Sequence, residues 1–166
     1  MPNFASNLSY FFQEYKIFDR FALSADAGFK AVEYQFPYYD KPELLFRLAE
    51  INNLKFVLIN APAGNFKNGE RGIAGLSGRE EEFKKSIENA VFYAQTLQCP
   101  RIHIMSGIYN NKSSKNKFIK TLINNLKFAC DYCEEKSIKV VIEPINLIDL
   151  PGYSINNLTI ALDLIS

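Results

Sequence analysis

The sequence contains few of the residues on which several classes of protein depend. Of its 166 residues, three are cysteine, one is histidine and none is tryptophan. A low and odd number of cysteines is typical of a reducing compartment, so we predict a cytoplasmic protein. Cys130 and Cys133 form a C-x-x-C pattern inside a predicted helix, but no second Cys/His pair is present to complete a zinc site. We therefore interpret both cysteines as packing residues.

Long apolar runs and an excess of charge of one sign are also missing. No run approaches the ~20 apolar residues of a membrane-spanning helix, and the first residues show no signal-peptide pattern. The formal net charge is +1, and no basic patch with interleaved aromatic residues is present. We expect neither a membrane nor a nucleic acid as partner. No Ser/His/Asp or Cys/His nucleophile arrangement is visible either.

What the sequence does have is an alternation of short apolar runs and amphipathic segments, repeated about five times. This order predicts an α/β fold with a parallel sheet and right-handed crossovers. The aromatic content of 14% indicates a substantial core or an apolar pocket. We expect Asn156 or Asn157 to cap the last helix. The expected strands are residues 4–9, 30–36, 54–60, 101–105 and 138–143, and the expected helices are residues 17–27, 43–52, 80–97, 117–136 and 158–166.

Two architectures fit this order. A doubly wound sheet of this length would be complete, whereas a (β/α)₈ barrel needs ~250 residues and would be represented by about five of its eight units. The chain stops inside a predicted helix, and no glycine-rich phosphate loop follows the first strand. Both details favour the barrel, although the pattern alone leaves both architectures open. We expect residues 1–166 to form a single domain, the N-terminal portion of such a barrel.

Residues 138–146 are the stretch around which we expect the site to be organised. The run predicts a strand buried on both faces that ends at Glu143, because Pro144 cannot extend the ladder. A charged group there needs a metal, a partner or a substrate, and ligands bind at this end of parallel strands. Glu143 is therefore a candidate metal ligand or general base; the alternative is an ion pair with a buried Lys or Arg. Asn146 and Asp149 add polar groups on the same loop.

Polar residues also mark three earlier strands. His103 alternates with apolar neighbours on the fourth strand, so its side chain faces the interior if the sheet closes into a barrel. The alternative is a hydrogen-bonded core histidine. Glu33 and Asn60 end the second and third strands, and we expect both to lie near the same mouth. Each of them, taken alone, also fits a solvated loop residue.

Residues 65–78 form a long polar loop with four glycines. Glycine supplies hinge freedom, and Glu70 and Arg71 supply charge at the centre of the loop, so we interpret the segment as a lid that contacts the substrate. The alternative is a solvated surface loop. Structureless loops of this length are usually functional or disordered, which favours a role.

Several of these segments are similar to those of a known family. The similarity is carried by residues 4–9, 28–34, 36–38, 60–64, 69–74, 78–83, 143–146, 149 and 151–153. Together they resemble the hydroxypyruvate isomerase family, within the sugar-isomerase and apurinic-endonuclease-like barrel superfamily. The resemblance covers nearly the whole chain and is most specific in the loops. Ile148 stands where the family commonly has an arginine.

The resemblance implies a TIM barrel that interconverts hydroxypyruvate and 2-hydroxy-3-oxopropanoate through an enediolate. It implies a small hydroxy-keto acid or sugar as substrate and two glutamates that flank it, of which Glu143 is the first. A divalent metal, Mg or Mn, is often present, with Glu143 as one ligand. The resemblance places the remaining ligands (Asp, His and Glu) and the second glutamate on three further strands. We therefore expect the edges of the sheet to be exposed, which favours a homo-oligomer.

Three alternatives remain. One is a sugar epimerase or isomerase with another substrate. The second is a folded remnant without activity, which turnover and unfolding measurements would recognise. The third, a metal-dependent abasic-site endonuclease, is disfavoured because such enzymes use several histidines and a cationic surface, whereas this sequence has one histidine, Asn60 at the third strand end and a net charge near zero.

Overall fold

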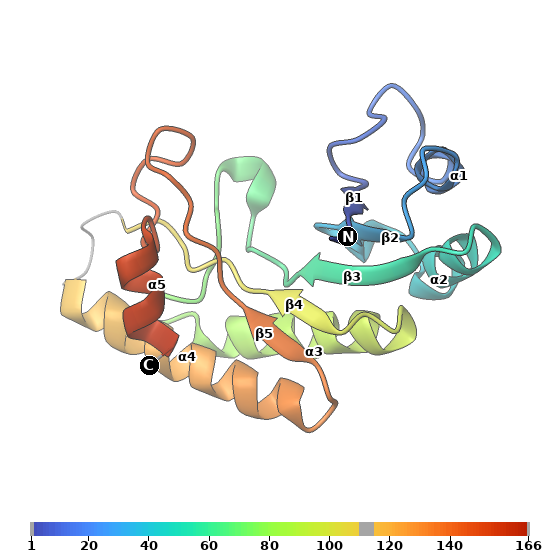
Figure 1. Ribbon diagram of the computed structural model, residues 1–166. Coiled ribbons are helices and arrows are strands. Elements are labelled where there is room, and N and C mark those ends of the chain that lie inside the picture. Colours follow the sequence, from blue (N-terminus) through green and yellow to red (C-terminus); the bar gives the residue numbers. More distant parts are fainter. Residues whose placement is uncertain (1, 110–114, 166) are drawn as a thin grey trace.

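A parallel five-stranded sheet forms the centre of the computed structural model, which describes residues 2–109 and 115–165. The spatial order of the strands is their order in the chain. A doubly wound sheet would reverse this order at a switch point, so the arrangement is that of successive units of a (β/α) barrel (Figure 1). The strands are β1 (Ala5–Asn7), β2 (Ala31–Tyr34), β3 (Lys55–Asn60), β4 (Arg101–His103) and β5 (Lys139–Val141).

A helix follows each strand along the chain, as the alternating pattern predicted. The helices are α1 (Asp19–Asp26), α2 (Pro42–Ile51), α3 (Glu80–Thr96), α4 (Lys115–Glu134) and α5 (Leu158–Ile165), and two short 3₁₀ helices are η1 (Pro37–Tyr39) and η2 (Phe66–Asn68). Most elements are slightly shorter than predicted, and Ser166 lies outside the described residues. Asn157 rather than Asn156 caps α5, because its Oδ1 accepts a hydrogen bond of 3.0 Å from the Ile160 N–H. Among the described residues, no helix is both long and apolar enough to cross a membrane.

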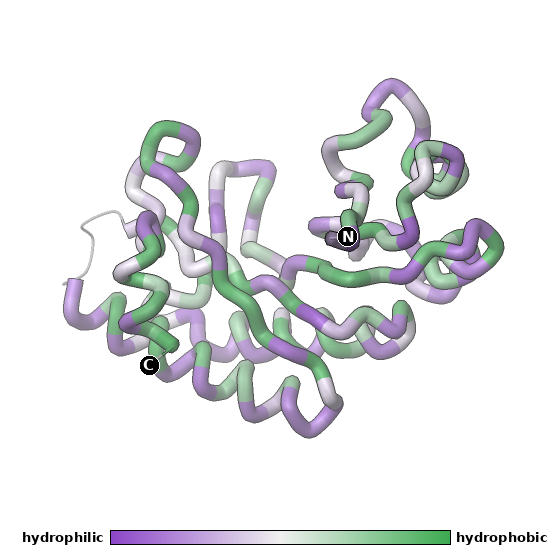
Figure 2. Tube along the Cα trace, in the orientation of Figure 1, coloured by the Kyte–Doolittle hydropathy of each residue, from purple (hydrophilic) through white to green (hydrophobic). Residues whose placement is uncertain are grey.

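The core lies between the sheet and the helices. Phe83, Ile87 and Val91 of α3 recur at helical spacing and are almost fully buried, and α4 buries a similar stripe that includes Cys133. Figure 2 shows this pattern as alternating polar and apolar positions along α4, with apolar residues concentrated on β3. The packing interpretation is confirmed for Cys133, which is fully buried, but is wrong for Cys130, which is exposed on the outer face of the same helix.

The strand that ends before Glu143 differs from the prediction. β5 stops at Val141, and Val140, Val141 and Ile142 are only half-buried while Glu143 is exposed. Burial on both faces was therefore a wrong expectation. The reason is that β5 is an edge strand of the sheet that the structure describes, with β4 as its one neighbour there. The alternative of a buried ion pair is also wrong, because no Lys or Arg in the described ranges pairs with Glu143.

The register brings polar strand ends together. Asn7 pairs with Glu33 across β1 and β2, Asn60 pairs with His103 across β3 and β4, and His103 pairs with Val141 of β5. Figure 1 shows the segments that follow β1, β3 and β5 rising to one side of the sheet, away from α3 and α4. The carboxyl ends of the strands thus share one edge, where ligands bind in folds of this type.

Candidate active site

A cavity of about 660 Å³ lies at the carboxyl ends of the strands. Every strand contributes to its lining, because the parallel sheet presents equivalent ends at one edge. The polar lining residues are Asn7, Glu33, Gln35, Asn60, Arg71, His103, Glu143 and Asp149, and the aromatic ones are Tyr10, Phe36 and Phe66. The volume suits a small molecule, since ligand pockets typically measure roughly 300–1,000 Å³.

The structure brings most of the predicted site residues together. Those that line the cavity are Glu33, Asn60, Arg71, His103, Glu143 and Asp149. Glu70 and Asn146 are not among the lining residues, although both lie on loops that border it. Whether any of these side chains binds substrate stays a prediction.

Asn7 was missed by the sequence reasoning. Its Nδ2 donates a hydrogen bond of 2.6 Å to Glu33 Oε1, and its own Oδ1 accepts one of 2.9 Å from the Ser9 N–H. In the structure Asn7 ends the first strand just as Asn60 ends the third. The predicted strand ran from residue 4 to residue 9, so Asn7 was placed inside it rather than at its end.

Burial sets the protonation behaviour of Glu33. Desolvation raises the pKa of its carboxyl, the Asn7 hydrogen bond opposes that rise, and the negative charge of Glu143 adds to it. Both glutamates line the same cavity. Glu33 is half-buried while Glu143 is exposed, so the cavity holds two carboxyl groups in unlike environments, the arrangement from which acid and base roles arise.

His103 lines the cavity and has a buried ring nitrogen without a hydrogen-bond partner among the described residues. The side chain is 4% exposed, and its Nε2 has no hydrogen-bond partner among the described residues. Desolvation lowers the pKa of the imidazole to about 4, so the ring is neutral at pH 7. The predicted alternative of a hydrogen-bonded core histidine therefore does not describe Nε2. A buried polar atom without a partner requires an explanation, and a ligand in the cavity supplies one.

The buried imidazole predicts a loss of stability in mild acid. Because the folded-state pKa of His103 is about 4 and the ordinary value is 6.5, the unfolded chain binds the extra proton first as the pH falls. Between pH 7.5 and pH 5 this linkage lowers the free energy of unfolding by about 2 kcal/mol. Urea unfolding of the native chain and of His103→Leu at both pH values checks it. The pH-dependent loss should be smaller in the variant by that amount, and equal losses would contradict the prediction.

Asn146 shapes the loop after β5. Its Oδ1 accepts hydrogen bonds from the N–H groups of Ile148 (2.9 Å) and Asp149 (3.0 Å), and its Nδ2 donates one of 2.6 Å to Asp149 Oδ2. This is the geometry of an Asx turn. The side chain predicted to contact substrate is thus engaged in the turn that places Asp149 at the cavity. Ile148 is 91% exposed and does not line the cavity.

The second half of the glycine-rich loop is not a lid. The Gly72 N–H donates to the Ala63 carbonyl (3.0 Å), the Gly75 N–H donates to the Ser106 carbonyl (2.9 Å), and Ile73 and Ala74 between them are buried. These contacts pack the segment against the chain that follows β4. Both the lid interpretation and its solvated alternative are therefore wrong for this half, because its glycines permit close packing rather than hinge motion.

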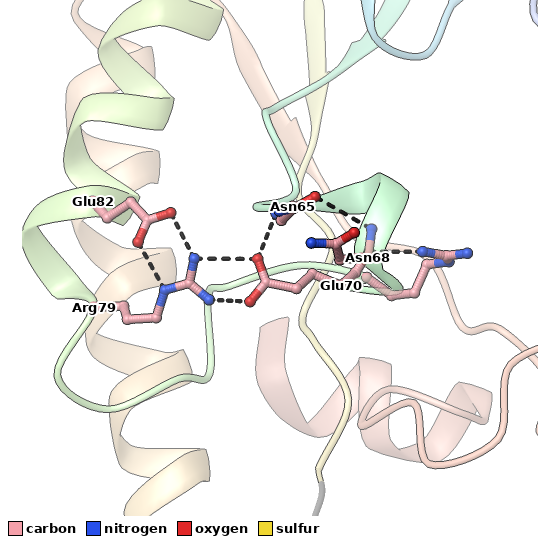
Figure 3. A network of polar contacts seen from close by, with 6 residues as sticks. Asn65, Asn68, Glu70, Arg79 and Glu82 are labelled. Carbon is pink, nitrogen blue, oxygen red and sulfur yellow. Dashed lines mark hydrogen bonds and ion pairs between the residues drawn. The ribbon is translucent and has the colours of Figure 1, made fainter.

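The first half of the loop is held by a polar network. Figure 3 shows Glu70 between Asn65 and Arg79. Its carboxylate accepts a hydrogen bond from the Asn65 N–H and forms an ion pair with Arg79, which also bonds Glu82 of α3 at 2.6 and 2.7 Å. The hydrogen bond from Arg79 is the main cause of the lowered pKa of Glu70. Glu70 is thus occupied by the protein, which explains why it does not line the cavity.

The resemblance implied a divalent metal, so the described residues can be compared with a metal site. Among residues 2–109 and 115–165, no group of three or more His, Cys, Asp and Glu side chains is placed to hold a metal ion. Mg²⁺ usually keeps several waters and binds through one or two carboxylates, so this observation does not decide the question. Glu143 as a metal ligand stays a prediction.

Fold and cavity together define a parallel α/β protein of barrel type, with acidic and neutral polar groups gathered at the carboxyl ends of its strands. Residues 21–166 match the family model described as the xylose isomerase-like TIM barrel. The chain belongs to this family. This result confirms the predicted fold class and superfamily.

Curated relatives agree with the resemblance found in the sequence. The chain is 42% identical over 157 residues to a 2-oxo-tetronate isomerase of Cupriavidus necator, covering 94% of this chain and 60% of the relative. It is 41% identical over 166 residues to the hydroxypyruvate isomerase of Escherichia coli K12, covering 99% and 64%. The chain therefore spans less than two thirds of the length of these relatives.

Solved structures show the same fold. The structure described as an AP endonuclease, family 2, from Brucella melitensis is 40% identical and superposes with a TM-score of 0.96, covering 99% of this chain and 64% of its own. A structure of the IOLI protein with a binding zinc atom is 14% identical with a TM-score of 0.74, and at that identity it shows the fold alone.

Proposed function

We propose that this chain carries part of the active site of an isomerase for small 2-oxo acids that bear a hydroxyl group on the neighbouring carbon. The observation that carries the proposal is the convergence of Glu33, Glu143 and the neutral His103 in one cavity. The names of the relatives, hydroxypyruvate isomerase and 2-oxo-tetronate isomerase, support it, since both substrates are 2-oxo acids of this kind.

The reaction moves a carbonyl group along a carbon chain by proton transfer. In hydroxypyruvate, a base removes a proton from C3, the electron pair forms a C2–C3 double bond, and the C2 oxygen takes the negative charge of the enediolate. A proton then returns to C2 while the proton of the C3 hydroxyl passes to the C2 oxygen, and 2-hydroxy-3-oxopropanoate results. We assign the base to Glu143, because its carboxylate is exposed at the cavity and has no ion-pair partner among the described residues.

The enediolate needs a group that stabilises its oxygen. We assign this role to His103, which lines the cavity and whose buried Nε2 has no partner among the described residues; in the tautomer protonated there, Nε2 can donate a hydrogen bond. A neutral imidazole can fill this role because its N–H donates a hydrogen bond to the enediolate oxygen and does not transfer its proton to a neighbouring carboxylate. Burial raises the pKa of Glu33. We assign its carboxyl group to a hydrogen bond with a hydroxyl group of the substrate.

The charges that line the cavity favour a small-molecule isomerase over an enzyme that cleaves phosphodiester bonds in DNA. Arg71 is the one cationic side chain that lines it among the described residues, whereas binding of DNA needs several phosphate contacts from Lys and Arg. A small-molecule substrate fits better. We extend the proposal to a cytoplasmic location, which the three free cysteines support.

Hydrogen exchange at C3 tests the proposed function. The purified chain is incubated with hydroxypyruvate in D₂O, and ¹H NMR follows loss of the C3 proton signal and formation of the aldehyde product. We expect exchange above the rate of a buffer blank and of Glu143→Gln. Exchange no faster than in these two controls, from a chain that still unfolds cooperatively, would overturn the proposal and favour an inactive folded remnant. Parallel assays with 2-oxo-tetronate identify the preferred substrate.

A further inference from the structure

One positive charge faces a cavity that is otherwise acidic. Of the described charged side chains that line it, Glu33, Glu143 and Asp149 are acidic and Arg71 is basic, while His103 is neutral at pH 7. A 2-oxo acid carries a carboxylate that these acidic groups repel. A substrate of that class therefore needs a cationic partner in the cavity, and Arg71 is the candidate that the described residues offer.

Arg71 is held in a defined position along the cavity wall. The carbon of its guanidinium lies 4.0 Å from the centre of the Phe66 ring, and the Phe66 ring lies 4.9 Å from that of Phe36. Both aromatic rings line the cavity. Nη1 of Arg71 donates to the carbonyl groups of Phe66 (3.0 Å) and Glu70 (2.9 Å). The stack and the two backbone bonds together fix the plane of the guanidinium.

The opposite edge of the guanidinium has no protein acceptor. Nε and Nη2 of Arg71 make no hydrogen bond within the part of the chain that the structure describes. These two nitrogens present parallel N–H groups that match the two oxygens of a carboxylate. His103, whose buried Nε2 has no partner among the described residues, lines the same cavity, which is a second observation that favours a polar ligand there.

Hydrogen bonds within the protein hold the loop that carries Arg71. Asn65 Oδ1 accepts a hydrogen bond of 3.2 Å from the Asn68 N–H and so caps η2, whose first residue is Phe66. The neighbouring Glu70 is fixed by Arg79 at the start of α3, as Figure 3 shows. A receptor ordered before the ligand arrives loses less entropy on binding. Glu70 and Arg79 thus act as positioning residues for Arg71.

We propose that Arg71 binds the carboxylate of the substrate through Nε and Nη2, and that this contact selects 2-oxo acids over neutral sugars. The proposal rests on the proposed function, since it names the substrate class of the same cavity. It changes the roles predicted from the sequence, because Arg71 contacts the ligand directly whereas Glu70 acts through Arg71.

Equilibrium binding of a matched pair of probes tests this proposal. Glycerate resembles hydroxypyruvate without its reactive carbonyl group, and glycerol replaces the carboxylate of glycerate by a hydroxymethyl group. NMR titration of the native chain should show that glycerate binds more tightly than glycerol. Arg71→Gln should weaken glycerate binding about 10- to 100-fold, the range for a charged hydrogen-bonded contact, and leave glycerol binding unchanged. Arg71→Lys, which keeps the charge but loses the fork, should recover only part of the affinity.

Lys67→Gln is the matched control. Lys67 lies in the same loop and carries the same charge, but its Nζ sits 5.5 Å from the centre of the Tyr39 ring and it does not line the cavity. Its removal should leave glycerate affinity unchanged. Equal losses in Lys67→Gln and Arg71→Gln would show a general charge effect and overturn the proposal, as would unchanged affinity in Arg71→Gln.

Turnover separates the two proposals. If the chain isomerises hydroxypyruvate, Arg71→Gln should raise KM far more than it lowers kcat, and Arg79→Gln should raise KM less, with partial rescue by Arg79→Lys. An unchanged KM in Arg71→Gln with intact turnover would overturn the carboxylate contact alone. Arg71-dependent binding of glycerate without any C3 exchange would support the contact and overturn the isomerase proposal.

Discussion

Glu143→Gln is expected to lower the rate of C3 proton exchange by about 10²- to 10⁴-fold, the usual contribution of a general base. Gln has nearly the same shape as Glu but cannot take a proton. The free energy of unfolding should change by less than ~0.5 kcal/mol, because Glu143 is exposed and has no ion-pair partner among the described residues. NMR exchange rates and urea unfolding measure the two quantities separately.

Glu88→Gln provides the comparison for this result. Glu88 is exposed on α3 and is not among the residues that line the cavity. Its substitution removes the same charge and should leave exchange unchanged. If Glu143→Gln retained the native rate, Glu143 would have no part in the proton transfer, and Glu33 would become the carboxyl group to test.

Gly72→Ala is expected to destabilise the fold by about 3–5 kcal/mol. Gly72 has φ +109°, and a Cβ there would collide with the backbone carbonyl of Met105 and approach the Gly107 nitrogen at 2.8 Å. Backbone strain costs about 1–3 kcal/mol and overpacking adds a similar amount. Backbone atoms cannot move aside as a flexible side chain does, so the loop after β3 must separate from the chain that follows β4.

Gly69→Ala separates the cost of the positive φ angle from the cost of the collision with neighbouring backbone atoms. Gly69 has φ +91°, but a Cβ at this position meets no atom within 4 Å. We expect this control to lose only about 1 kcal/mol, the cost of the backbone conformation. Urea unfolding of both variants gives the comparison. Equal losses at the two positions would contradict the packing argument, since only Gly72 approaches another backbone segment.

The sequence predicted the strand-end residues more successfully than the loop residues. Asn60 and His103 could be placed because a parallel sheet fixes where strand ends lie once the strands are recognised. Asn7 was not recognised as a strand end because the first strand was predicted to continue to residue 9, two residues beyond its observed end. Burial around β5 was misjudged because β-branched composition does not reveal whether a strand lies at an edge.

Loop residues depended on contacts that no local pattern encodes. Glu70 and Arg71 are adjacent and both charged, yet one pairs with Arg79 and the other faces the cavity. Arg71 lies over the Phe66 ring, which contacts Phe36 in a tilted arrangement although the two residues are 30 positions apart in the sequence. The polar character of residues 65–78 likewise concealed the packing of Gly72 against Met105, which depends on the chain after β4.

The strand order has a consequence for how this protein family can diversify. Because neighbours in the sheet are neighbours in the chain, each strand-and-helix unit delivers its own part of the cavity. The proposed enediolate donor His103 ends β4 and the proposed base Glu143 follows β5, whereas Arg71 comes from the loop after β3. Under these proposed assignments, substitutions in the loop after β3 are expected to change which substrate binds and to leave the base in place, so that a new specificity requires the replacement of one segment only.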